Sequence, residues 1–163
     1  MKIIIWKEIE GYKNYMISDH GEVFSLISQK ILKKNKKVKK KDGYTWYQTC
    51  IYNGSRASKY TPKISKLVAM TFIPNTENKP EVDHINRNSL DDRAINLRWA
   101  DRSEQTINRG VQKNNKLGIK NIRQNKEGNY RVVIHRKKKK VFDKTYETIE
   151  EAIKERDTFL SSL

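Results

Sequence analysis

Polar and apolar residues alternate along much of residues 1–64, and a period of two is the pattern of a half-buried strand. Residues 15–18 and 22–26 alternate in this way on either side of Asp19-His20-Gly21, a sequence that favours a hairpin turn. Residues 44–52 form a further strand-like stretch that is rich in aromatic side chains. The pattern therefore predicts a β-rich element over residues 1–64.

The period then changes from that of a strand to that of a helix. The positions that recur on one helix face are Ile64, Leu67, Val68, Thr71 and Phe72. Thr61-Pro62 or Ser65 can begin this helix, and Pro74 ends it. Residues 81–109 are predicted to form a strand, a long loop, a second strand and a helix. The first turn of that helix carries a capping box of Asp101 and Glu104.

A second, smaller unit is expected at residues 118–163, after a polar linker over residues 111–117. Its pattern predicts three short strands, at residues 119–123, 130–135 and 141–142. An amphipathic helix follows, and Thr148 with Glu151 forms its capping box. One helix covers one face of such a sheet, so the other face is expected to be free for contact with a partner.

The charge of the chain points to a polyanionic partner. Its 163 residues include 35 lysines and arginines against 19 aspartates and glutamates, which gives a formal net charge of +16. Eight lysines lie between Lys30 and Lys41, and the run from Arg136 to Lys140 is wholly basic. Charge runs most often form a solvated face, but in a chain this basic they favour contact with nucleic-acid phosphates.

Two other features narrow the class of protein. No apolar run is long enough to span a bilayer, and the basic runs flank no apolar segment that would hold the chain on a membrane. Cys50 is the only cysteine, so no disulfide can form within the chain and no cysteine-based zinc site is expected. This usage fits a reducing cytosol.

A candidate for acid–base chemistry stands at the end of the strand predicted before the long loop. Asp83 and His84 are adjacent there, and Asn96 follows twelve residues after His84. An imidazole side chain, here that of His84, can serve as a base that takes a proton from water at neutral pH. An amide oxygen such as that of Asn96 can accept the ring N–H and hold the imidazole in one orientation. These residues predict a general base at the strand end.

The same region offers oxygen ligands for a metal ion. Asp83 can bind Mg²⁺ or a similar hard cation, and Gln105 or Asn108 can supply a second oxygen from the helix. Each residue also has a simpler interpretation, because an Asp-His pair is most often a turn, Asn96 can cap a turn and Gln105 can lie on a helix surface. The joint pattern in a basic chain favours a metal beside a base, which hydrolysis of a phosphodiester requires.

The motifs resemble those of the HNH endonuclease family, in its phage and intron homing branch. The residues that carry the resemblance are Phe72-Ile73-Pro74-Asn75, Lys79-Pro80-Glu81-Val82-Asp83-His84-Ile85-Asn86, Asn96-Leu97-Arg98-Trp99-Ala100 and Arg102-Ser103-Glu104-Gln105. The resemblance implies His84 as general base, Asp83 as metal ligand and Asn96 as the residue that orients His84. The last ligand of the family, Asn or His, aligns with Gln105, and Asn108 one helical turn later is the alternative.

Two flanking segments extend the resemblance. Residues 6–12 and 15–23 resemble the nuclease-associated modular (NUMOD) element that precedes such cores. Residues 118–159 resemble the DNA-binding domain of plant ethylene-response factors, whose sheet lies in the major groove. By that resemblance the expected DNA contacts are Arg123, Arg131, His135, Arg136, Lys137 and Lys138.

The sequence thus predicts an α+β protein with a ββα-metal (HNH) nuclease core, a β-rich N-terminal element and a small C-terminal domain of three strands plus a helix. The expected domains are residues 1–64, 65–110 and 118–163, with the linker at 111–117. The small C-terminal domain is expected to bind DNA. The expected partner is double-stranded DNA, bound by a monomer without a membrane or a small-molecule cofactor.

The expected function is site-directed DNA cleavage that depends on one Mg²⁺ or Mn²⁺ ion per active site, by a homing enzyme in the cytoplasm of a bacterial host cell. Two alternatives remain open, a non-cleaving sequence-specific DNA-binding regulator and an RNA-binding protein. A regulator has no need of Asp83, His84 and Asn96 together, and no RNA-recognition signature is recognisable in the sequence.

Overall fold

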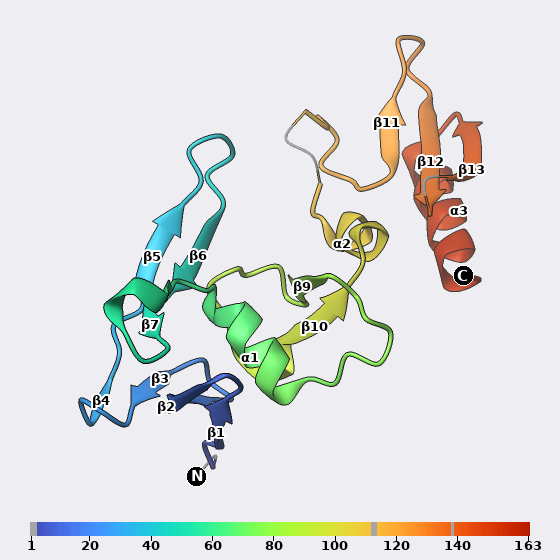
Figure 1. Cartoon of the computed structure of the whole chain (residues 1–163). Coiled ribbons are helices and arrows are strands. Elements are labelled where there is room, and N and C mark those ends of the chain that lie inside the picture. Colours follow the sequence, from blue (N-terminus) through green and yellow to red (C-terminus); the bar gives the residue numbers. More distant parts are fainter. Residues whose placement is uncertain (1–2, 112–113, 138) are drawn as a thin grey trace. The chain divides into compact units, whose positions relative to one another are not determined.

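The computed structural model describes residues 3–111, 114–137 and 139–163 (Figure 1). The chain divides into two compact units, Met1–Gln105 and Thr106–Leu163. Strands predominate in the described residues and three α-helices accompany them, which confirms the expected α+β class. Within the described ranges, no helix is both long enough and apolar enough to cross a bilayer.

The first unit begins with a four-stranded antiparallel sheet in the order β1-β2-β3-β4. Its strands are β1 (Trp6–Ile9), β2 (Tyr12–Ser18), β3 (Val23–Ser25) and β4 (Lys30–Ile31). β2 and β3 are joined by the turn predicted at Asp19-His20-Gly21, where Gly21 takes a φ of 76° that L side chains rarely adopt. The alternation within β2 buries Tyr15 and Ile17 in the core of the unit.

Two short hairpins follow in the chain. β5 (Asn35–Val38) pairs with β6 (Thr45–Gln48), and β7 (Ile51–Tyr52) pairs with β8 (Lys59–Tyr60) after a single 3₁₀ turn, η1 (Arg56–Ser58). The lysine-rich segment therefore contributes β4 and β5, and all four residues of β5 are exposed. These exposed strands present their lysines to solvent.

Helix α1 (Ile64–Phe72) closes the core of the first unit. It begins after Lys63, which is not one of the expected start residues and whose side chain makes no capping hydrogen bond. It ends before Pro74, as predicted. One hydrophobic cluster joins the helix to the first sheet, to β7 and to Leu97. Its buried members are Ile9, Tyr15, Ile17, Val23, Ile51, Ile64, Leu67, Val68 and Leu97. Residues 1–64 and 65–110, which we expected as separate domains, thus share a core.

The strand–strand–helix segment lies after α1. β9 (Glu81–His84) and β10 (Leu97–Ala100) are antiparallel, a 3₁₀ turn η2 (Ala94–Asn96) leads into β10, and α2 (Arg102–Asn108) follows. The predicted capping box is present, because the Asp101 N–H donates to Glu104 (2.7 Å) and the Glu104 N–H donates to Asp101 (2.8 Å). The order of elements is that of a ββα core.

The second unit is a three-stranded antiparallel sheet with one helix. Its elements are β11 (Ile122–Gln124), β12 (Tyr130–Arg136), β13 (Lys139–Tyr146) and α3 (Ile149–Ser161). The third strand is longer than its two apolar residues suggested, because it pairs along almost all of β12. Ile122, Val132, Ile134 and Ala152 form the core, and the Thr148 side chain caps α3 as predicted by accepting from the Glu151 N–H.

Candidate functional site

The loop between β9 and β10, residues 85–96, holds the candidate catalytic residues in place and is called the β9–β10 loop below. His84 is the last residue of β9 and pairs with Leu97, the first residue of β10. The two ends of the loop are therefore adjacent. His84, Asp92 and Asn96 are 6, 5 and 7% exposed. The loop, which contains mostly polar residues, is therefore buried at Asp92 and Asn96, next to His84 at the end of β9.

His84 is oriented by a buried carboxylate. Its Nε2 lies 2.9 Å from Oδ1 of Asp92, whose side chain is 3% exposed. An ionised carboxylate only accepts hydrogen bonds, so Nε2 carries the proton and Nδ1 carries the lone pair. This is the tautomer that a general base needs, with Nδ1 as the proton acceptor.

Asn96 has a different position from the one expected. Its amide donates to Asn86 Oδ1 (3.0 Å) and to the Asp91 carbonyl (2.8 Å), and its oxygen accepts from the Asn86 N–H (3.0 Å). The hydrogen bond to the His84 ring that we expected from Asn96 is made by Asp92, while Asn96 closes the loop on itself. In the β9–β10 loop, the Asp92 carboxylate therefore contacts the imidazole, and the Asn96 amide holds together two parts of the loop.

Asp92 is the functional candidate that the sequence did not reveal. It lies in Leu90-Asp91-Asp92-Arg93, where two carboxylates are adjacent. The Arg93 guanidinium pairs with Asp91 and lowers the pKa of that carboxyl to about 2, whereas Asp92 turns inward. The sequence does contain one signal. Two adjacent aspartates have a single arginine beside them, so one of the two aspartates is expected to find its partner elsewhere in the fold.

Asp83 and the expected helix ligands define where a cation could be held. Asp83 Oδ2 accepts from the Arg98 guanidinium on the neighbouring strand, at 2.9 Å from Nη2. Gln105 is half-buried at the end of the first unit, and Asn108 falls in the second unit. Among the described residues, no three His, Cys, Asp or Glu side chains gather into a ligand group. Asp83 and an amide fit a hard cation by donor type, and Arg98 competes for one carboxylate oxygen.

An aromatic pair flanks the loop on the β5–β6 hairpin. Tyr44 and Trp46 are stacked with ring centroids 6.0 Å apart, and Lys63 Nζ lies 5.5 and 5.3 Å from the two centroids. Thr45 Oγ1 lies 3.4 Å from Ser89 Oγ of the loop. Burial, and then the negative charges of Asp92 and Asp83, raise the pKa of Tyr44. The hairpin therefore places an aromatic and basic surface within electrostatic reach of the site.

The second unit presents the expected DNA contacts on its sheet. Arg123 pairs with Arg131 across β11 and β12, and Arg131 and His135 alternate with buried Val132 and Ile134, so they lie on the face that α3 does not cover. Arg131 makes two hydrogen bonds of 2.7 Å to Asp143. These bonds, followed by the one from Lys140, hold the pKa of that carboxyl well below its usual range.

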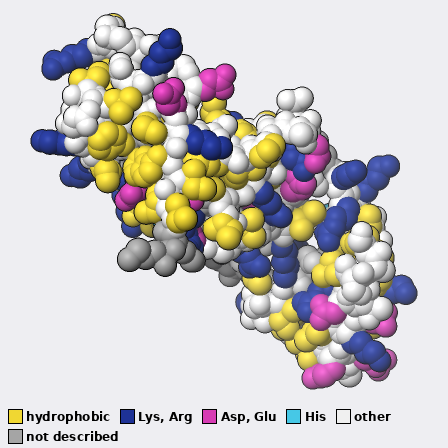
Figure 2. Space-filling view, turned by 90° about the horizontal axis from the view of Figure 1, so that it is seen from below, with side chains coloured by type: hydrophobic (Ala, Val, Ile, Leu, Met, Phe, Trp, Pro, Cys, Tyr) yellow, Lys and Arg dark blue, Asp and Glu magenta, His cyan; other side chains and the backbone are white. Residues whose placement is uncertain are grey.

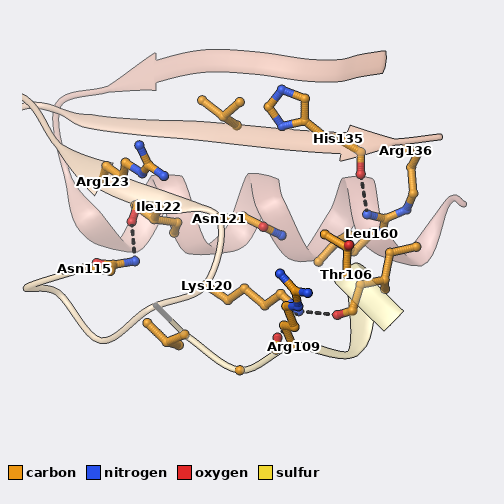
Figure 3. A pocket seen from close by; sticks show the side chains of 14 residues that line it. Thr106, Arg109, Asn115, Lys120, Asn121, Ile122, Arg123, His135, Arg136 and Leu160 are labelled. Carbon is orange, nitrogen blue, oxygen red and sulfur yellow. Dashed lines mark hydrogen bonds between the residues drawn. The ribbon is translucent and has the colours of Figure 1, made fainter. Parts of the chain in front are cut away.

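The remaining expected contacts lie at the end of β12. Arg136 is half-buried and donates to the His135 carbonyl (3.0 Å), Lys137 is exposed in the turn that follows, and Lys138 lies outside the described residues. Arg123, His135 and Arg136 also line a hollow of about 740 Å³ within the second unit (Figure 3). Lys120 spans that hollow and donates to the Ile107 and Arg109 carbonyls.

Basic side chains are spread over the visible surface of the molecule, with hydrophobic side chains gathered between them (Figure 2). The described lysines and arginines that line the sheet and the β5 strand are mostly exposed. Such a distribution suits contact with a polyanion at many points.

Comparisons with known proteins agree with these motifs. Residues 5–48 match the NUMOD4 motif. The chain is 33% identical over 110 residues to the DNA endonuclease I-HmuI of Bacillus phage SP01, covering 65% of this chain and 59% of that protein. It is 38% identical over 104 residues to the uncharacterized HNH endonuclease L247 of Acanthamoeba polyphaga mimivirus, covering 61% of this chain and 24% of that protein.

A solved structure of the HNH homing endonuclease I-HmuI, concerned with DNA binding and cleavage, is similar in fold to this chain. The TM-score is 0.54 at 27% identity, over 93% of this chain and 82% of that one. The matched part of the chain spans 59% of the length of I-HmuI and 24% of the length of L247. The expected likeness of residues 118–159 to the plant domain stays a prediction. The chain is therefore similar in sequence and in fold to HNH homing endonucleases, and its residues 5–48 match the NUMOD4 motif.

Proposed function

We propose that this chain is a site-directed DNA endonuclease of the homing type, in which the first unit carries the chemistry and the second contributes to targeting. The observation that carries the proposal is the hydrogen bond of 2.9 Å between His84 and buried Asp92, next to the carboxylate of Asp83. A protein that only binds DNA gains nothing from a buried carboxylate on an imidazole, because burying such a charge costs stability.

The chemical step follows from the tautomer of His84. A water attacks the phosphorus while its proton passes to Nδ1. The bond from phosphorus to the 3′ oxygen breaks, and the oxygen leaves as an alkoxide that takes a proton from solvent. The imidazolium that forms is stabilised by the Asp92 carboxylate at Nε2 (2.9 Å). Asn96 supports this step indirectly, since its three hydrogen bonds fix the ends of the β9–β10 loop.

A divalent cation, Mg²⁺ or Mn²⁺, would be held by Asp83 and by the amide oxygen of Gln105 or Asn108, one ion per site. When bound, it supplies positive charge that stabilises the scissile phosphate and the leaving oxygen. The oxygen donors and the homologues support this assignment. Arg98 would share or release Asp83 as the ion binds, because its guanidinium contacts Oδ2.

Double-stranded DNA is the proposed partner, bound by one copy of the chain in the cytoplasm of a bacterial host. The net charge of +16 supplies affinity through phosphate contacts, which position the duplex but read no sequence. Arg123, Arg131 and His135 on the free sheet face are the proposed reading residues, since arginine can recognise guanine by paired hydrogen bonds.

The test is to incubate the protein with supercoiled DNA from phage and host, with Mg²⁺ and with a chelator, and to map any new ends. We expect ends at one or a few sites that need the cation, with binding retained in the chelator. Metal-independent binding with no cleavage under any divalent cation would identify a regulator instead.

A further inference from the structure

The turn between β2 and β3 touches the β9–β10 loop at the residue that holds His84. This turn, residues 18–22, is called the β2–β3 turn below. A Cβ built on Gly21 would lie 3.2 Å from the Cβ and 3.3 Å from the carbonyl oxygen of Asp92, and 2.9 Å from Ile64 Cγ2. Two features favour glycine at this position. Its φ of 76° is one that L side chains rarely adopt, and a Cβ would crowd Asp92 and Ile64.

A hydrogen bond fixes the loop on the other side of Asp92. The Ala94 N–H donates to the Asp19 carbonyl at 2.8 Å. Asp19 is itself held by Ile5, whose N–H donates to Oδ1 (3.1 Å) and whose carbonyl accepts from the Asp19 N–H (3.0 Å). Two contacts from one turn, at residues 92 and 94, thus determine the path of the main chain that carries the carboxylate.

The carboxylate of Asp92 cannot hold this position alone. Its Oδ2 is buried and has no hydrogen-bond partner among the described residues, and Oδ1 contacts His84. A buried carboxylate oxygen without a hydrogen bond is costly, and it adds nothing to fix the direction of the side chain. The orientation must therefore come from the main chain, which the β2–β3 turn contacts.

We propose that the β2–β3 turn is a positioning element for the His84 imidazole, acting through Asp92. The proposal rests on the proposed function, in which His84 is the general base. It assigns part of residues 5–48, the stretch that matches the NUMOD4 motif, to the catalytic centre. The N-terminal element is then needed for the chemical step as well as for any contact with DNA.

Gly21→Ala and Gly11→Ala form a matched pair of variants. Gly11 has a φ of 77°, almost the same as Gly21, but a Cβ there meets nothing within 4 Å. The two substitutions therefore carry the same backbone strain, and only Gly21→Ala pushes on Asp92. Asp92→Ala removes the carboxylate and shows the size of the complete effect.

The first readout is the proton NMR signal of the His84 ring N–H, recorded without metal or DNA and assigned by its loss in His84→Ala. A ring N–H that donates to a buried carboxylate is shifted downfield and protected from exchange. We expect the signal to survive in Gly11→Ala and to disappear or broaden in Gly21→Ala and Asp92→Ala. If a variant loses this signal and remains folded, the loss reports on the His84–Asp92 hydrogen bond and not on general unfolding.

The second readout is the single-turnover cleavage rate with protein in excess over DNA. We expect Gly21→Ala to lower it roughly 10- to 100-fold relative to Gly11→Ala, because small misplacements of a reacting group cost this much. DNA affinity in chelator should be equal in the two variants. An unchanged signal in Gly21→Ala, or equal cleavage rates in the pair, would overturn the proposal.

Ser18→Ala keeps the test decisive if Gly21→Ala does not fold. Ser18 Oγ accepts from the Glu22 N–H at 2.9 Å, so its removal loosens the same turn without adding volume. The signal should weaken in this variant, and full retention would contradict the proposal. Because the NMR signal needs no cleavage, the two proposals can fail separately. A wild-type protein that cuts no DNA would refute the proposed function, while loss of the signal in Gly21→Ala but not in Gly11→Ala would still support the positioning of His84 by the turn.

Discussion

The β9–β10 loop of the first unit and the sheet of the second unit hold their polar residues in opposite ways. The loop has little regular structure, yet its Asp92 and Asn96 are buried and hydrogen-bonded, and Asp92 contacts His84 at the end of β9. The sheet is regular, yet Arg123, Arg131 and His135 are exposed on it. Regularity of the backbone is therefore a poor guide to how precisely a side chain is placed.

The difference follows from what each region is proposed to do. A general base must meet one water with one lone pair, so its imidazole needs a fixed tautomer and a fixed direction. A reading residue must reach a base edge on a duplex that arrives from solution, so it needs exposure and tolerates motion. Variants in the two regions should therefore change different quantities.

Removal of the metal is expected to have the largest effect. Chelation should stop cleavage while leaving DNA binding intact, and Mg²⁺ or Mn²⁺ should restore it, since the proposed ligands are oxygens. Asp83→Ala should raise the metal concentration required or abolish activity, as measured by plasmid cleavage against metal concentration. Comparing Gln105→Ala with Asn108→Ala then identifies the second ligand. Activity that persists in full chelation would contradict the assignment of Asp83.

His84→Ala should reduce the cleavage rate by about 10²–10⁴-fold, the usual contribution of a general base. Single-turnover kinetics with saturating protein measure the rate, and a binding titration in chelator serves as the control because affinity should stay nearly the same. A rate within a few-fold of wild type would remove His84 from the mechanism.

Arg131→Ala should lower the preference for the target site by about 5- to 150-fold, the range for loss of one paired contact to a base. Asp143→Asn is the complementary variant, because it releases Arg131 and Lys140 from the carboxylate that they share. We expect it to raise affinity for all sequences and to reduce discrimination, as measured by competition between target and unrelated duplexes. Discrimination as strong as that of the wild type in both variants would show that this face reads no sequence.

Single lysines in the exposed strand β5 should have the smallest effect. Wild-type affinity should fall with salt along a log–log slope of roughly −5 to −9, for about six to ten phosphate contacts. Lys36→Ala and Lys37→Ala should each reduce that slope by about one. Lys154→Ala, on the helix that covers the other face of the second sheet, is the control. A flat salt dependence of the wild type would be incompatible with phosphate contacts.

Local patterns in the sequence predicted the fold well where they act over a few residues. The capping box of Asp101 and Glu104, the N-cap at Thr148 and the stop before Pro74 are confirmed, because each depends on neighbours within one helical turn. The shared core of residues 1–64 and α1 was missed, since the pattern shows which residues are buried but not against what. β13 was predicted too short because pairing with β12, and not apolar residues, sets its length.

The candidate site shows the same limit. Asp83 and His84 were found from their spacing and family likeness, which need no knowledge of the loop. Asp92 was missed because nothing in the sequence says which of two adjacent aspartates turns inward. The answer depends on Gly21 and Asp19, about seventy residues earlier, whose contacts exist only after folding.

The central claim is that chemistry and targeting reside in different units, and one measurement tests it directly. On a duplex that carries the mapped site, both the dissociation constant and the single-turnover rate at saturation are determined for His84→Ala and Arg131→Ala. The account predicts that His84→Ala lowers only the rate and that Arg131→Ala raises only the dissociation constant. If either variant changes both quantities to a similar extent, the two units do not divide the work in this way.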